Sequence, residues 1–241
     1  MGYSYNENRV KKETDAVVWL KHHWEANYII SGFGQVTDLS SGENWSLYAG
    51  VLYVVGPNDR HRLLVTEDMH YVSIFCPPLR GDEVFDKDGG YEASGPIEQT
   101  ERRMFVKRAD EMGRLIVANG RAGTLRMLTK ADGLGFGLSD VHFAAGAEAV
   151  LWYKHHWEAN HILSGTGEVT DLGTGQTWKL EPSMAYNVGP KDRHRVRART
   201  DMHLLSIFCP PLMGDEQHDE DGSLAPSGPV PPGPAGYAAR D

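Results

Sequence analysis

The sequence predicts an all-β protein built from two copies of one antiparallel β-sandwich or barrel. The first observation is a long internal repeat, because the segment KHHWEAN occurs at residues 21–27 and again at residues 154–160. The second observation is local. Short segments rich in β-branched and aromatic residues alternate with Gly, Pro and Asp, as in antiparallel sheets. Sustained 3.6-residue periodicity is absent, which argues against long helices.

The repeat has one constant offset of 133 residues. Aligning residues 17–96 with residues 150–229 needs no gap, and 47 of the 80 aligned positions are identical. A period of this length indicates a duplicated domain rather than a solenoid repeat. We therefore expect an N-terminal domain over residues 1–96, a connection over 97–113, a C-terminal domain over 114–224 and a Pro/Gly-rich tail over 225–241.

The two copies differ at their fronts. Residues 102–133 precede the aligned part of the C-terminal copy, and the same offset places their counterparts before Met1. The N-terminal copy is therefore expected to begin about one strand into the unit, which leaves a barrel edge that another segment has to cover. The connection is rich in charged residues, which indicates a solvated segment with one helical turn over residues 102–112.

Each strand of the C-terminal copy is expected from its own residues. Residues 149–165 are rich in β-branched and aromatic side chains and end in Ser-Gly. Residues 167–180 have the pattern of a strand, a glycine turn and a second strand. Three more strand-like segments follow over residues 183–188, 194–199 and 202–210, and Gly, Pro and Asp separate them.

Composition limits the classes of function. The chain has 33 acidic and 24 basic residues, and its formal net charge of -9 disfavours a nucleic-acid-binding surface. The apolar runs are too short for a membrane span, and the first residues contain no apolar stretch of a secretory signal. Two cysteines argue against a disulfide scaffold and fit a reducing compartment. We expect a cytoplasmic protein that acts on a small molecule, with no nucleic-acid or membrane partner.

One polar cluster falls within an apolar strand. Glu158 lies among tryptophan, isoleucine and leucine residues, where an unpaired carboxylate is costly, and the same glutamate recurs as Glu25. His156 shares the predicted strand face of Glu158. A tyrosine and a histidine follow the glutamate by 28 and 36 residues in both copies. Oxygen and imidazole donors suit Fe(II), Mn(II) or Zn(II), which predicts one metal site of Glu158, Tyr186 and His194 and another of Glu25, Tyr53 and His61. A plain polar patch on an exposed strand face is the alternative.

These motifs resemble those of the cupins, and more closely those of the ectoine synthase family. The matching stretches of the C-terminal copy include GLGF at 133–136, WYK at 152–154, GTGEVTD at 165–171, KDRH at 191–194, FCPPL at 208–212 and HDEDG at 218–222. The N-terminal copy resembles the same family over residues 2–89. The resemblance implies a bicupin, with two double-stranded β-helix (jelly-roll) barrels. Because the family is dimeric, the duplication predicts an internal pseudo-dimer, and homo-oligomers of whole chains stay open.

The resemblance also implies roles for individual residues. It makes Glu158, Tyr186 and His194 the ligands of an iron ion, with Fe(II) favoured over Zn(II) or Mn(II). The catalytic residues that it implies are Tyr153, His156, Arg126, Glu216 and His218, and the substrate-binding residues are Trp152, Phe208 and Val141.

Several positions depart from the family pattern. Ala122 stands where the family has a tryptophan, and Val141 stands where it has a threonine. In the N-terminal copy, Leu20 and Phe85 replace the pocket tyrosine and the capping histidine. We therefore expect the C-terminal copy to be the working site, and we expect weak or absent activity on the ectoine precursor.

The resulting hypothesis is a metal-dependent carbon–oxygen lyase similar to ectoine synthase. In this reaction a free amine attacks an amide carbonyl of a small polar, nitrogen-containing metabolite, and water is lost. Two alternatives stay open. The first is an iron-dependent cupin oxygenase on a small metabolite, which would consume dioxygen during turnover. The second is a non-catalytic bicupin that binds a metal or a small ligand without turnover.

Overall fold

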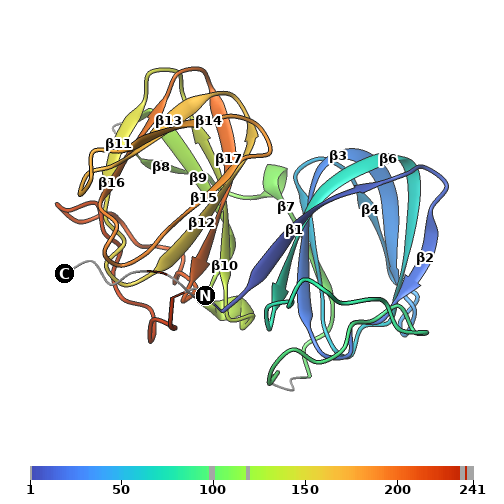
Figure 1. Cartoon of the computed structure of the whole chain (residues 1–241). Helices are drawn as coiled ribbons and strands as arrows, with labels where there is room; N and C mark the ends of the chain where they lie inside the picture. Colours follow the sequence, from blue (N-terminus) through green and yellow to red (C-terminus); the bar gives the residue numbers. More distant parts are fainter. Residues whose placement is uncertain (1, 98–100, 118–119, 234–236, 238–241) are drawn as a thin grey trace. The chain divides into compact units, whose positions relative to one another are not determined.

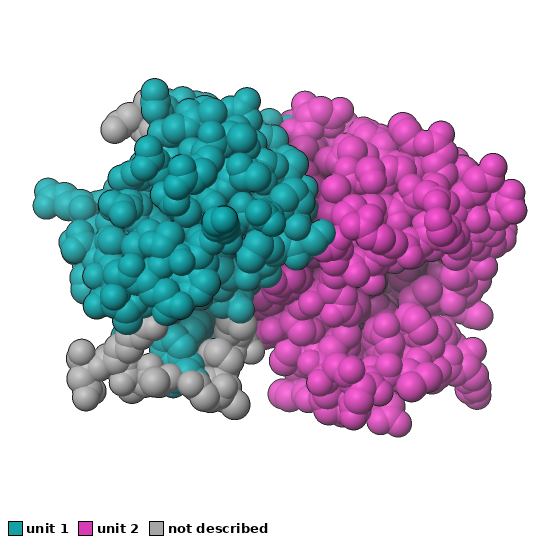
Figure 2. Space-filling view, turned by 45° about the horizontal axis from the view of Figure 1, so that its top comes forward, with its two compact units in different colours: residues 1, 112–241 teal, residues 2–111 magenta. Residues whose placement is uncertain are grey.

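The computed structural model describes residues 2–97, 101–117, 120–233 and 237. Its regular elements are β-strands and short 3-10 turns, which confirms the predicted all-β class (Figure 1). The chain divides into two compact units, residues 2–111 and residues 112–241 (Figure 2). In the described part of the chain, no helix is long and apolar enough to cross a membrane.

The N-terminal unit is one seven-stranded antiparallel sheet that curves around an apolar interior (Figure 1). Its elements are β1 (Ser4–Val10), β2 (Asp15–Val18), β3 (Trp24–Asp38), β4 (Asn44–Leu47), β5 (Val51–Val55), β6 (His61–Cys76), β7 (Phe105–Arg108) and the 3-10 turn η1 (Ala109–Glu111). The strand order is β1-β6-β3-β5-β7, with β2 paired to β6 and β4 paired to β3. Because the strands alternate their side chains, one face fills the interior.

The C-terminal unit has the same plan but splits into two sheets, one of six strands and one of four. Its elements are β8 (Leu115–Val117), β9 (Ala122–Leu128), η3 (Lys130–Asp132), β10 (Gly137–Phe143), β11 (Glu148–Leu151), β12 (Trp157–Ser164), β13 (Gly167–Asp171), β14 (Thr177–Leu180), β15 (Ala185–Val188), β16 (His194–Ala198) and β17 (Met202–Cys209). The sheet orders are β15-β12-β17-β10-β9-β8 and β11-β16-β13-β14. β3 and β6 run unbroken where this unit has two strands each, so the N-terminal unit keeps a single sheet.

The register of the strands follows the sequence repeat. Glu25 pairs with Phe75 on β6, and Glu158 pairs with Phe208 on β17, 133 residues later in both cases. The repeated tryptophans behave alike as well, because the Nε1–H of Trp152 donates to a proline carbonyl at 2.8 Å, as does that of its counterpart in the N-terminal unit. The two copies therefore share their strand pairing as well as their sequence.

The front strands and the connection account for the main difference between the units. β9 and β8 extend the sheet beyond β10, whereas no described strand pairs with the outer edge of the equivalent β1. β7 lies within the range expected to be a solvated connection, yet it pairs with β5, and the helical turn is limited to η1. Phe105 and Val106 are good strand formers, and the open edge of β5 offers them backbone partners.

The described part of the tail has no regular structure, but it is attached to the C-terminal unit. The Nε1–H of Trp157 donates to the carbonyl oxygen of Pro231 at 3.0 Å. The hydroxyl of Tyr237 donates to the carboxylate of Asp192 at 2.9 Å. The tail therefore closes over the start of β12 and the loop before β16.

Gly165, between β12 and β13, should tolerate no side chain. Its φ is +81°, and a Cβ atom there would lie 2.1 Å from the carbonyl oxygen of Asp201. We expect Gly165→Ala to lower the free energy of unfolding by about 2–5 kcal/mol, from left-handed strain and overpacking together. The matched control is Gly175→Ala, since Gly175 has a φ of +76° and open space around it. Urea unfolding of both variants would contradict this account if their midpoints were equal.

Candidate active site

A cavity of about 270 Å³ lies inside the barrel of the C-terminal unit. It is smaller than the usual pocket for a drug-sized ligand and suits a small metabolite. Seven of the residues implied by the family resemblance line it, namely Arg126, Val141, Tyr153, Glu158, Tyr186, Phe208 and His218. Three uncharged polar residues that the sequence reasoning missed also line it, namely Thr124, Asn160 and Ser206.

Glu158 is a deeply buried carboxylate at this cavity. Burial raises the pKa of Glu158 to about 7, and the neighbouring polar side chains of Asn160 and Ser206 only partly oppose that effect. The charge of Glu158 in turn adds to the burial that holds the pKa of Tyr186 well above its ordinary value. The phenol therefore keeps its proton near neutral pH when no cation is nearby.

His194 stands beside the same tyrosine. Its ring centroid lies 6.3 Å from that of Tyr186, and its Nδ1 lies 3.0 Å from the carbonyl oxygen of Asp192. That contact fixes the orientation of the ring and leaves the lone pair of Nε2 available to bind a metal ion. The Nε2 atom of His194 and the Oε2 atom of Glu158 are buried, and neither has a hydrogen-bond partner among the described residues.

Buried polar atoms without hydrogen-bond partners lower the stability of the fold, and a cation bound to them restores it. Carboxylate, phenol and imidazole are donors that first-row divalent ions accept. The side chains of this site therefore fit a divalent metal ion. In the N-terminal unit the equivalent histidine, His61, is oriented in the same way, with Nδ1 at 3.1 Å from the carbonyl oxygen of Asp59.

Arg126 is the positively charged side chain at the cavity. It comes from β9, and its Nη1 donates to the hydroxyl of Ser139 at 3.0 Å. The Nε atom of Arg126 is buried and has no partner among the described residues. Its guanidinium lies 6.0 Å from the ring centroid of Phe208, at the cavity wall. Among the described residues, no strand of the N-terminal unit occupies the position of β9, so that unit has no equivalent of this arginine.

Tyr153 and His218 form a hydrogen-bonded pair at the cavity. The Tyr153 hydroxyl lies 3.2 Å from His218 Nε2. Burial lowers the pKa of His218, and Arg126 lowers it further. Burial holds the pKa of Tyr153 well above its ordinary value. Near neutral pH the pair is therefore a protonated phenol in contact with a neutral imidazole, which is a starting point for proton transfer.

Besides His194 and Glu216, two more implied site residues do not line the cavity. The prediction that His156 shares a strand face with Glu158 is wrong, because β12 begins at Trp157 and His156 lies in the preceding turn. His156 is fully buried, with Nε2 at 3.1 Å from the hydroxyl of Ser227 and its ring edge-on to Phe208. Trp152 is half-buried and stacks under Lys154. Both residues support the site rather than face it.

Glu216, which the resemblance implies to be catalytic, has its carboxylate held by its own turn. Its carboxylate accepts the backbone N–H groups of Met213 and Gly214. Burial alone would raise the pKa of Glu216, but these hydrogen bonds bring it below the ordinary value. Glu83 accepts the equivalent backbone N–H groups in the N-terminal unit. The recurrence of this glutamate in both copies therefore follows from the turn that it stabilises.

The pairing of β9 with β10 shows what surrounds the two positions, Val141 and Ala122, that depart from the family pattern. Thr124 on β9 is the direct cross-strand partner of Val141, and its buried hydroxyl has no hydrogen-bond partner among the described residues. A hydroxyl is thus present next to the position where the family threonine is missing. Ala122 packs in the apolar core beside Phe143 and is not part of the cavity wall.

Larger side chains occupy the interior of the N-terminal barrel. Tyr71 and Tyr91 stand where the C-terminal unit has Leu204 and Leu224. Both tyrosines pack against the core, and the Tyr91 ring stacks on Phe85 with centroids 4.5 Å apart. Burial and then the charge of Glu25 raise the pKa of both phenols, so both lie near that carboxylate. The space around the N-terminal glutamate is therefore more crowded.

Comparison with known proteins identifies the family. A profile described as ectoine synthase matches residues 1–95 and residues 103–227, which together span both copies. The chain belongs to the ectoine synthase family. The L-ectoine synthase of Shouchella clausii is 39% identical over 119 residues, which cover 49% of this chain and 89% of that protein. The L-ectoine synthase of Desulfatibacillum aliphaticivorans is 38% identical over 124 residues, covering 50% of this chain and 95% of that protein. Each relative thus matches about half of this chain.

Solved structures give the fold. An oxalate decarboxylase from Lactobacillus farciminis has a TM-score of 0.65 and 12% identity, covering 88% of this chain and 78% of that chain. A Bacillus subtilis oxalate decarboxylase described for its Mn(II) centres has a TM-score of 0.66 and 14% identity, covering 87% and 69%. At these identities the likeness concerns the fold alone, and it confirms the bicupin prediction. This member of the ectoine synthase family is an enzyme, a carbon–oxygen lyase of the cyclase and dehydratase type.

Proposed function

We propose that the C-terminal barrel closes a ring in a small N-acylated diamino acid with loss of water, as the name of its L-ectoine synthase relatives suggests. The observation that carries the proposal is one cavity lined by a buried carboxylate, a half-buried arginine and a phenol–imidazole pair. We expected weak activity on the ectoine precursor because Val141 replaces the hydroxyl of the family threonine. Thr124, directly opposite Val141, offers a hydroxyl at the same place and so supports a substrate of the ectoine-precursor class.

Arg126 would hold the carboxylate of the substrate. Its Nε–H is buried without a partner among the described residues, and Arg126 lines the cavity, so an anion bound there would gain a charge-assisted hydrogen bond. Holding the substrate at one end brings its free amine near its own amide carbonyl. Such positioning replaces a search in solution and supplies much of the rate.

The ring closes by formation of one C–N bond and loss of the carbonyl oxygen as water. The amine nitrogen attacks the carbonyl carbon and gives up two protons, and both leave with the oxygen. His218, neutral near pH 7, would accept each of the two protons in turn, and after each transfer the Tyr153 hydroxyl would donate to the departing oxygen and recover a proton from His218. Both groups touch the cavity, and their direct contact makes the relay short.

Glu158, Tyr186 and His194 would hold a divalent metal ion, with Fe(II) favoured. When bound, the ion supplies Lewis-acid polarisation of the carbonyl oxygen. Arg126 lies at the same cavity as Glu158 and limits the negative charge around the site. The equivalent set in the N-terminal unit, with Glu25, would bind an ion without a substrate pocket.

Incubation with N-γ-acetyl-diaminobutyrate tests the proposed function. The full chain reconstituted with Fe(II) should release the cyclic amidine ectoine, detected by mass spectrometry, without consuming dioxygen. Dioxygen uptake that matches turnover would point instead to the oxygenase. Saturable binding without product would point to the non-catalytic bicupin. The internal pseudo-dimer, the homo-oligomer and the cytoplasmic location stay predictions.

Arg126→Gln should raise KM for this substrate by about 10–150-fold, the value of one hydrogen bond to a charged group. Arg126→Lys keeps a charge but loses the planar fork, so a smaller increase is expected. Steady-state kinetics of the two variants provide the measurement. If Arg126→Gln lowers kcat and leaves KM unchanged, the arginine does not bind the substrate carboxylate.

A further inference from the structure

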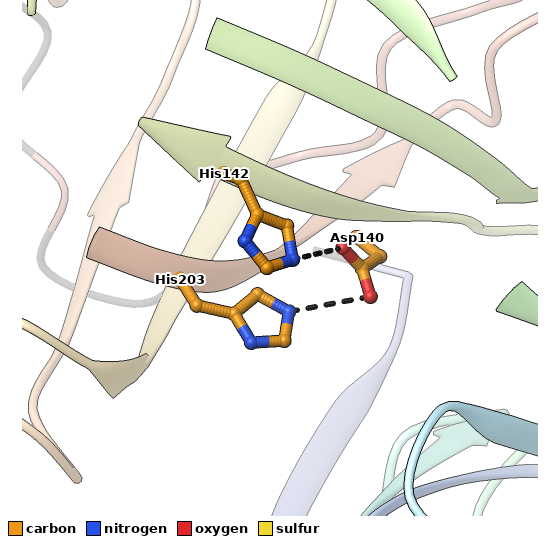
Figure 3. Close-up of side chains that lie close together, drawn as sticks. All are labelled: Asp140, His142 and His203. Carbon is orange, nitrogen blue, oxygen red and sulfur yellow. Dashed lines mark ion pairs between the residues drawn. The ribbon is translucent and has the colours of Figure 1, made fainter. Parts of the chain in front are cut away.

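A second group of metal-ligating side chains lies outside the cavity, on β10 and β17. Asp140, His142 and His203 each offer one donor atom, and these three atoms lie within 4.8 Å of one another (Figure 3). His142 Nε2 lies 3.2 Å from one carboxylate oxygen of Asp140, and His203 Nε2 lies 3.2 Å from the other. The two imidazole rings stack, with centroids 3.9 Å apart.

The sheet register holds these side chains together. Asp140 and His142 are two residues apart on β10 and share a face, and His203 on β17 is the direct partner of His142. Val141, between the first two, lines the cavity, so the cluster lies on the opposite face of the strand. The Asp140 side chain is 2% exposed, but that of His142 is 49% exposed. An ion from solvent therefore has a path to a buried carboxylate.

The N-terminal unit provides an internal comparison. Glu7, Arg9 and His70 occupy the equivalent positions on β1 and β6. Arg9 Nη2 lies 3.0 Å from Glu7 Oε1, and His70 Nε2 lies 2.6 Å from the same oxygen. An arginine within the strand balances that carboxylate. In the C-terminal unit the same position is a histidine, whose neutral form is a metal donor.

We propose that Asp140, His142 and His203 bind a divalent first-row transition-metal ion at a site separate from the cavity. Two imidazoles and one carboxylate are a donor set that such ions accept, with positions left for water. With tetrahedral bonds of about 2.0–2.2 Å, neighbouring donor atoms lie about 3.3–3.6 Å apart. Each imidazole Nε2 lies 3.2 Å from a different oxygen of Asp140, close to that spacing, and one donor atom from each of the three residues lies within 4.8 Å of the others.

Arg114 is the competing cation at this site. Its Nη1 lies 3.3 Å from Asp140 Oδ1, and its side chain passes over Gly123, where a Cβ atom would collide with it. Binding would require this long contact to yield to the ion. The ion would then join β10 to β17 from outside, and this role does not depend on the proposed function.

Titration of the whole metal-stripped protein with Zn²⁺ alone tests the site. His142→Arg copies the N-terminal unit, should keep the fold, and should bind one equivalent less than the wild type. Asp140→Asn should weaken that equivalent by about 100-fold or more, since even indirect partners of a metal contribute 10–100-fold. Arg114→Gln should tighten it, because a competing charge is removed. Glu158→Ala, at the cavity, should leave it unchanged.

Two results would overturn the proposal. The first is an unchanged number of equivalents and an unchanged affinity in His142→Arg. The second is the loss of every equivalent in Glu158→Ala. A crystal soaked in ZnCl2 supplies a measurement that needs no variant. Anomalous density between the three side chains is expected, and its absence at saturating Zn²⁺ would also overturn the proposal.

Discussion

Replacing Glu158 with alanine should abolish turnover, whereas the same replacement of Glu25 should leave most of it. Glu158 lines the cavity with Arg126 and Tyr153, and one of its carboxylate oxygens is buried without a hydrogen-bond partner in the described part of the chain. Loss of a preorganised charged group at the reacting centre costs about 10²–10³-fold or more in kcat. Glu25 lies among tyrosines that crowd the N-terminal barrel. We therefore expect no comparable loss in kcat there.

The comparison needs both variants folded and their metal counted. Circular dichroism should show the strand content of the wild type, and elemental analysis after Fe(II) reconstitution should show one equivalent less in Glu158→Ala. An equal loss of activity in the two variants, or a larger loss in Glu25→Ala, would reverse the assignment of the working barrel. No metal in the wild type after reconstitution would reject the metal site itself.

His218→Phe should lower kcat by about 10²–10⁴-fold with little change in KM, the usual contribution of a positioned general acid or base. The substitution installs the residue type that the N-terminal unit carries at Phe85. Burial and Arg126 lower the pKa of His218 from its ordinary 6.5, so the neutral form persists to lower pH. The kcat of the wild type should therefore fall only at a pH below 6.5, where the imidazole of His218 gains a proton.

The pH profile distinguishes proton transfer from a packing role. His218→Phe should lose the acid limb of the kcat profile, while a half-buried control outside the cavity, His155→Gln, should keep both the limb and the rate. Tyr153→Phe should also lower kcat, because it removes the hydroxyl 3.2 Å from His218 Nε2. A variant of His218 that kept the acid limb would show that another group provides it.

Much of the architecture follows from local patterns. The constant offset of 133 residues predicts two equal folds, and the identical registers of Glu25 with Phe75 and Glu158 with Phe208 agree with it. Glu158 and Tyr186 could be chosen from the sequence because polar side chains recur at fixed spacing within apolar strands, whereas Phe208 was implied only by the family resemblance. Such recurrence can be read directly from the sequence, because the alternation of side chains along a strand depends only on neighbouring residues.

Other parts of the site depend on which strand meets which. Thr124 stands opposite Val141 only through the pairing of β9 with β10, and Tyr71 crowds the N-terminal barrel only because its side chain turns inward toward Glu25. Glu216 resembles a catalytic acid in sequence, but backbone N–H groups of its own turn already bind its carboxylate. Spacing along the chain carries no signal for such contacts.

The sequence by itself determined the duplication, the all-β class and the chemistry-bearing residues of the C-terminal cavity. The tertiary structure decided that β7 completes the N-terminal sheet, that His156 lies in a turn, and that Asp140 meets His203 from a strand 63 positions away. The physical reason is the range of the forces. Strand patterns arise from neighbouring residues, whereas edge pairing and buried polar contacts form only where the folded sheet brings distant residues together.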